Sequence, residues 1–164
     1  MERHLTELKT LLFEEIALHE ALRDDLAFEL AQDGNLNGAE FLKLQQRKYI
    51  RAQQIEEMEA RRIGQVRSMA EAWQTEPRQL TLRAIIARCS PPLAGEFEAC
   101  HGKLQTLVNE IRPLARETAA NAQARLKAID ATLAVIGEAA RMHPTYSEEG
   151  RLQQRPPTFK HTSA

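Results

Sequence analysis

The sequence has few cysteines, no secretory leader and no long hydrophobic run. Its two cysteines, Cys89 and Cys100, are too few for a disulfide scaffold. The start of the chain, Met1 to His4, lacks the basic residues and the apolar core of a signal peptide. No apolar run approaches the roughly 20 residues that cross a bilayer. These absences predict a cytoplasmic protein without a transmembrane segment.

The chain also lacks an excess of charge of either sign. The 22 basic and 23 acidic residues leave a formal net charge of -1, so no overall field steers the chain toward nucleic acid or an anionic membrane. The basic pair Arg61 and Arg62 follows Glu56, Glu57 and Glu59, which predicts ion pairs on a helix surface. We therefore expect no nucleic-acid partner.

Aromatic residues make up only 5% of the chain, whereas Ala, Leu, Glu, Gln and Arg are abundant, which is typical of long helices. Apolar residues at steps of three and four predict helices over about residues 3–33 and 39–74. Gly34 is suited to end the first of these, and Asn37 or Gly38 to begin the second. Because Pro77 prevents the second helix from continuing, a short helix over about 79–88 is expected next.

A third long helix is predicted over about residues 92–142, which would span roughly 70 Å at 1.5 Å per residue. Its first part has a regular heptad seam, with Leu93, Phe97, Cys100, Leu104, Leu107, Ile111, Leu114, Thr118 and Asn121 at alternating steps of four and three. Pro113 lies inside this pattern and predicts a kink. The predicted fold is all-α: an elongated antiparallel bundle or coiled coil of three long helices and a short connecting helix over residues 1–143, with a flexible tail over 144–164.

The sequence contains few motifs that are typical of catalytic, metal-binding or phosphate-binding sites. Glu98 and His101 have the three-residue spacing of a di-iron helix motif, but no second copy exists. Cys100 occupies a seam position, where a thiol acts as a small hydrophobic side chain, and zinc would need ligands that the sequence does not supply. The seven glycines form no phosphate-binding loop. We therefore expect no catalytic site, metal or cofactor.

The order of residues resembles that of FlgN-type bacterial flagellar export chaperones over most of the chain. In the second helix the similar positions are Lys48, Ile55, Met58, Glu59 and Arg62. Near the carboxy terminus the similarity comprises a central asparagine, an apolar run and a tail with tyrosine and glycine: Asn121, then Leu126, Ile129, Leu133 and Ile136, then Tyr146 and Gly150. Ala122 departs from the family, in which many members have glycine at this point.

The resemblance implies a cytosolic type III export chaperone. Such a protein would bind the carboxy-terminal segments of hook-associated (hook-filament junction) proteins, prevent premature assembly and deliver them to the membrane-bound export gate. It implies client binding by Asn121 and the apolar run 126–136, and docking to the cytosolic domain of the gate by Tyr146. Two alternatives remain open: the apolar run packs in the protein's own core, or the seam closes a homodimer of a self-associating scaffold or adaptor protein.

Overall fold

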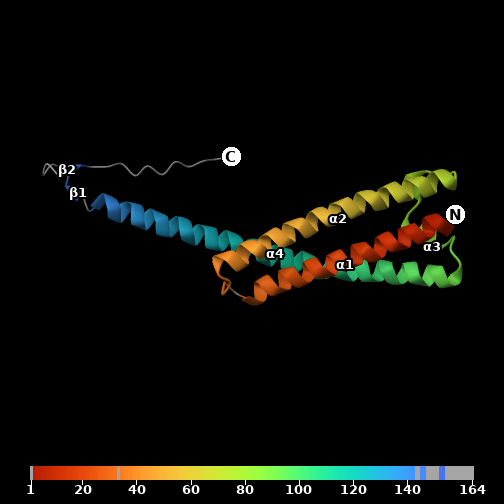
Figure 1. The fold of residues 1–164 in the computed structure, drawn as a ribbon, viewed down its shortest axis with the longest axis horizontal. Coiled ribbons are helices and arrows are strands. Elements are labelled where there is room, and N and C mark those ends of the chain that lie inside the picture. The colour runs from red at the N-terminus through yellow and green to blue at the C-terminus, as the bar shows by residue number, and fades with distance from the viewer. Residues whose placement is uncertain (1, 33, 143–144, 147–151, 154–164) are drawn as a thin grey trace. The chain divides into compact units, whose positions relative to one another are not determined.

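The computed structural model describes residues 2–32, 34–142, 145–146 and 152–153. The elements are α1 (Glu2–Gln32), α2 (Gly38–Ala72), the 3-10 helix η1 (Pro77–Gln79), α3 (Leu82–Ile86), α4 (Pro91–Met142), β1 (Thr145–Tyr146) and β2 (Leu152–Gln153) (Figure 1). Long helices dominate, so the predicted all-α class is confirmed. Residues Met1–Thr118 form one compact unit and Ala119–Ala164 a second, and α4 contributes to both.

Helices α1 and α2 form a hairpin whose turn is specified locally. Gly34 has a φ of 84°, the left-handed conformation that lets glycine close a helix. Asn37 caps α2: its side chain accepts a hydrogen bond from the Glu40 amide at 2.9 Å, and the Glu40 carboxylate accepts one from the Asn37 amide at 3.2 Å. This reciprocal capping box stabilises the start of α2, typically by about 1 kcal/mol.

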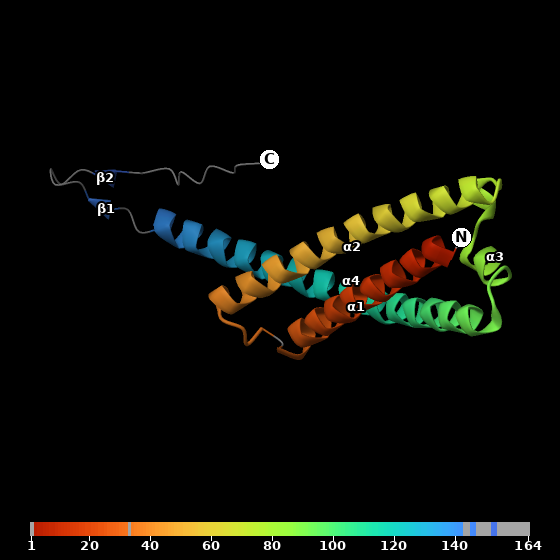
Figure 2. The ribbon, with the colours of Figure 1, turned by 45° about the vertical axis from the view of Figure 1, so that its right-hand side comes forward.

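The first part of α4 runs parallel to α1 within the unit Met1–Thr118 (Figure 2). Three cross-helix ion pairs follow each other in the same order along both helices: Lys9 with Glu96 at 2.8 Å, Glu20 with Lys103 at 2.8 Å, and Arg23 with Glu110 at 3.2 Å. Since α2 is antiparallel to α1, the unit is a three-helix bundle with up, down and up helices.

The core of this unit joins α1, α2, α3 and α4. The largest fully buried side chains are Phe97, Leu8, Met69, Ile85 and Leu107. They come from α1, α2, α3 and α4, so the short helix α3 closes one end of the core. The regular seam predicted in the first part of α4 thus supplies Phe97 and Leu107 to a shared interior.

Both cysteines are part of this packing. Cys100 is only 3% exposed, and Cys89 is partly buried against the core with its thiol directed at the carbonyl of Ile85, 3.2 Å away. Burial raises the pKa of both thiols, and for Cys100 the charge of Glu96 raises the pKa further. A raised pKa keeps the thiol protonated and weakly nucleophilic, so both cysteines act as small hydrophobic side chains.

The connector differs from the single short helix predicted over 79–88. Pro77 begins η1, the chain leaves helical geometry at Leu80 (φ −85°, ψ 65°), and α3 then begins with Thr81 as its cap. The Thr81 hydroxyl accepts a hydrogen bond from the Ala84 amide at 3.2 Å. The connector therefore breaks into two short helices because a threonine cap favours a new helix start within the predicted one.

Helix α4 continues through Pro113, so the proline does not end it. The compact unit, however, ends at Thr118, earlier than the bundle predicted over residues 1–143. Most of the predicted tail, residues 144–164, lies outside the described residues. The described part of the tail is an antiparallel pair, in which Thr145 faces Gln153 and Tyr146 faces Leu152.

Candidate binding surface on helix α4

The second half of α4 carries a row of exposed apolar side chains. Leu126 is 62% exposed, Ile129 55%, Leu133 46% and Ile136 56%. Steps of three and four residues place them on one face of the helix, and we call these four residues the apolar stripe. A row of large exposed apolar side chains is a feature of interaction sites, whereas single ones are ordinary.

The earlier seam of the same helix differs in burial. Phe97 and Leu107 are 0% exposed, and Thr118 is 7% exposed. Spacing alone does not distinguish the two segments, because both have apolar residues at helical intervals. Burial does distinguish them: the seam builds the bundle core, and the stripe is left uncovered by the residues that the structure describes.

Asn121, the fifth predicted client-binding residue, is exposed but does not belong to the stripe. It lies five positions before Leu126, which corresponds to about 140° around a helix of 3.6 residues per turn. The structure therefore groups Leu126, Ile129, Leu133 and Ile136 and leaves Asn121 to one side.

Local sequence explains why the backbone stays helical around the uncovered stripe. Alanine, the strongest helix former, recurs here as Ala119, Ala120, Ala122, Ala124, Ala128, Ala131 and Ala134. The Thr132 hydroxyl donates a hydrogen bond to the Ala128 carbonyl at 2.9 Å, so this polar group is satisfied within the helix. The stripe is therefore already formed before any partner binds, which lowers the entropy cost of binding.

The chemistry of the stripe suits an apolar partner. Between Leu126 and Ile136 the only charged residues are Lys127 and Asp130, of opposite sign. Fully burying a leucine or isoleucine contributes about 1.5–3 kcal/mol. Because the four side chains are about half exposed, covering them would contribute on the order of 4 kcal/mol, mainly through the hydrophobic effect.

Tyr146, the predicted gate-docking residue, lies in β1 opposite Leu152 in β2. This places its backbone in a short antiparallel pair. The position of its side chain lies outside what the structure describes, so its role stays a prediction.

Three buried carboxylates on α1 were missed by the sequence analysis. Glu15, Asp25 and Glu29 are 8%, 5% and 8% exposed. Each forms ion pairs with basic residues of α2. Glu15 pairs with Arg62 at 3.0 Å, Asp25 pairs with Arg47 and Arg51 at 2.6 Å each, and Glu29 pairs with Lys48. The sequence did contain an indication of this burial. Glu15 and Glu29 lie on the same helical face as the apolar residues Leu8, Leu12, Leu22 and Leu26.

The predicted ion pairing around Arg61 and Arg62 is present, and it also extends to a second helix. Arg62 does approach Glu59 of its own helix, at 3.8 Å, but its closer partner is Glu15 of α1. Arg61 likewise reaches across to Glu14 of α1, at 3.5 Å. These arginines join two helices, because the facing carboxylates of α1 lie within reach.

No group of three or more His, Cys, Asp or Glu side chains that would hold a metal ion occurs within residues 2–32 and 34–142 or the described strands. No helix in the described part of the chain is long and apolar enough to cross a membrane.

The bundle and the stripe define an all-α protein with a row of exposed apolar side chains on its longest helix. Residues 1–154 match the family model described as FlgN protein, and the chain belongs to this family of flagellar export chaperones. No curated protein and no solved structure matches the chain.

Proposed function

We propose that this chain is a cytoplasmic chaperone that binds the carboxy-terminal segments of flagellar hook-associated proteins. Binding keeps the client from premature assembly, and the chaperone then delivers it to the export gate. The observation that carries the proposal is the apolar stripe, a preformed helical face that the described residues leave uncovered.

The physical model is recognition between amphipathic helices. A client segment that is disordered before assembly lays its apolar face on Leu126, Ile129, Leu133 and Ile136 and orders on binding. The ordering entropy offsets part of the roughly 4 kcal/mol from burial, so affinity stays moderate. Moderate affinity permits release at the export gate.

Calorimetric titration of the purified chain with a hook-associated protein tests this function. We expect binding with a negative heat-capacity change, the mark of apolar burial. A client that lacks its carboxy-terminal segment should show no binding heat. Equal affinity for the intact and the shortened client would contradict the proposal.

The gate step rests on Tyr146. We expect Tyr146→Ala to weaken binding to the cytosolic domain of the export gate about tenfold or more, because a large aromatic side chain is lost from the docking segment. Client affinity should stay within twofold of that of the unmodified chain. Surface plasmon resonance with the immobilised gate domain measures the first effect, and calorimetry measures the second.

The control is Tyr49→Ala, which removes the other tyrosine of the chain, 65% exposed on α2. This variant should bind the gate domain normally. Unchanged gate affinity in Tyr146→Ala, or an equal loss in both variants, would refute the assignment to Tyr146.

A self-associating scaffold is the second candidate, because a second copy of the chain would also cover the stripe. Light scattering over a dilution series separates the two. A dimer that persists on dilution and excludes the client would favour the scaffold, whereas a monomer that takes up one client favours the chaperone.

A further inference from the structure

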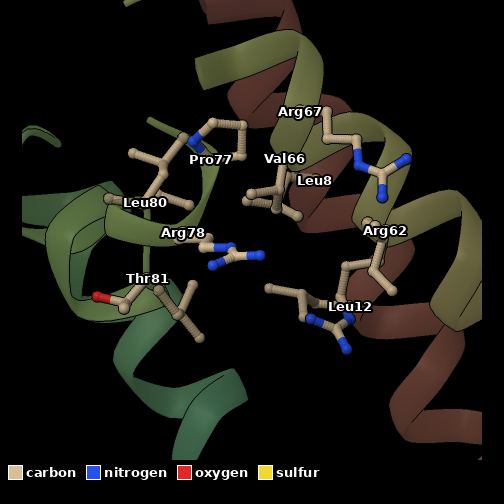
Figure 3. Close-up of a pocket in the computed structure, with 12 residues that line it drawn as sticks. Leu8, Leu12, Arg62, Val66, Arg67, Pro77, Arg78, Leu80 and Thr81 are labelled. Atoms are coloured by element: carbon tan, nitrogen blue, oxygen red, sulfur yellow. The ribbon is translucent and has the colours of Figure 1, made fainter. Parts of the chain in front are cut away.

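A second candidate site lies in the unit Met1–Thr118, at the closed end of the bundle. It is a pocket of about 360 Å3 between α1, α2 and the connector formed by η1 and α3 (Figure 3). This volume falls within the range of about 300–1,000 Å3 that is usual for ligand pockets. The proposed client surface on α4 does not include any of its residues.

The floor of the pocket is apolar. Leu8, Leu12, Leu80 and Ile85 line it, each at most 4% exposed, and Ile63 borders it at 40% exposure. An apolar floor of this kind accepts a large hydrophobic side chain. Polar ligands without an apolar group would leave it unfilled.

Three guanidinium groups surround this floor. Arg62 and Arg67 come from α2, and Arg78 from η1 extends across the pocket (Figure 3). Among the described residues that line the pocket, none is acidic. Arg62 has its partner in Glu15, but Arg67 and Arg78 form no ion pair with any residue that the structure describes. The mouth of the pocket therefore has two arginines that are available to pair with a ligand.

We propose that this pocket binds an acidic peptide segment of another protein, with one large apolar side chain on the floor and carboxylates at Arg67 and Arg78. The arginines favour a peptide because they come from separate elements, α2 and η1, around the opening. Carboxylates spaced along a peptide can reach both of them, whereas the single headgroup of a fatty acid can neutralise only one charge. Arginine also binds carboxylates with two parallel hydrogen bonds where the geometry permits.

Methyl NMR titration of the full chain tests the proposal. The probe is the pentapeptide acetyl-Asp-Glu-Phe-Asp-Glu-amide, whose ring shifts nearby methyl signals. We expect the methyl signals of Leu8, Leu12 and Ile85 to move with increasing peptide concentration. Two comparison peptides, with alanine for the phenylalanine or with lysine for the four acidic residues, should produce shifts at least tenfold smaller at equal concentration.

The double variant Arg67→Glu with Arg78→Glu should weaken peptide binding at least tenfold. Both side chains are exposed, so the fold is expected to persist. The matched control is Arg112→Glu with Arg116→Glu, two exposed arginines of α4 outside the pocket lining that undergo the same change of charge. The control should stay within twofold of the unmodified chain, because surface charges away from the pocket are screened by salt.

Absence of shifts at these methyls with the acidic peptide would overturn the proposal. Equal weakening in the two double variants would also overturn it, since binding would then follow net charge alone. Shifts produced by dodecanoate and not by the peptide would overturn it in favour of a lipid site. None of these outcomes bears on client binding by α4, which the calorimetric titration measures separately.

Discussion

Replacing Leu133 and Ile136 together with glutamate is expected to weaken client binding about 100-fold or more. The two side chains are 46% and 56% exposed, so a bound client segment would cover about half of each. The change removes about 2 kcal/mol of apolar burial and places two carboxylates against an apolar partner. A total loss of about 3 kcal/mol corresponds to the stated factor, since each 1.4 kcal/mol is tenfold.

Calorimetry with a hook-associated protein measures this loss, and circular dichroism checks the helix. Helicity and the melting temperature should change little, because the replaced side chains are not part of the core and glutamate is a good helix former. The matched control is Ala131→Glu with Val135→Glu, two exposed positions away from the stripe on the same helix. Normal client binding by the Leu133 and Ile136 variant would show that the stripe is not the client surface.

The second large effect concerns stability. Phe97→Ala should lower the free energy of unfolding of the unit Met1–Thr118 by about 3–5 kcal/mol. Phe97 is 0% exposed and packs in the cluster that joins α1, α2, α3 and α4. Its removal loses the transfer free energy of the ring and leaves a cavity that the neighbouring helices fill only partly.

Urea unfolding followed by circular dichroism measures this change. Phe13→Ala provides the control, because the same side chain is 52% exposed on α1 and its loss should cost less than about 1 kcal/mol. The midpoint should shift without a change in slope if the variant remains two-state. Similar destabilisation in the two variants would contradict the core position assigned to Phe97.

The sequence predicted most of the helical unit because its signals are local. Gly34 and Asn37 determine the hairpin turn through their own backbone and side-chain preferences, and they act as predicted. The seam from Leu93 to Thr118 was visible because every inward position is apolar or small. The division of the connector at Leu80 was missed, since Pro77 and Thr81 can each begin a helix and the sequence alone does not choose between one helix and two.

The sequence alone could not predict whether the apolar stripe is buried or exposed. Leu126 and Ile136 have the same three- and four-residue spacing as core residues such as Leu107. Whether such a row is buried depends on which other elements lie beside it, and that is a property of the whole fold. The role of Tyr146 and the identity of the client stay predictions for the same reason, because they depend on partners.

The pocket and the buried ion pairs depend on how segments that are far apart in the sequence are placed beside each other in the fold. Arg67 and Arg78 occur in ordinary polar stretches, and their common pocket with Leu8 arises only when η1 folds back onto α1 and α2. Glu15 is in phase with apolar neighbours, but its pairing with Arg62 depends on the register of the hairpin. Sequence periodicity predicts which face of a helix is buried, but it does not determine the register of α2 against α1.

The buried carboxylates of α1 have a consequence for how the hairpin can move. Apolar contacts are non-directional, so leucines alone would tolerate a slide of α2 along α1 by one turn, about 5.4 Å. Such a slide would separate Glu15 from Arg62 and Glu29 from Lys48, and it would leave Asp25 with only one of its two arginines, so buried charges would lose partners, which is strongly unfavourable. The buried ion pairs therefore favour one register of the hairpin and oppose a sliding motion of α2 along α1.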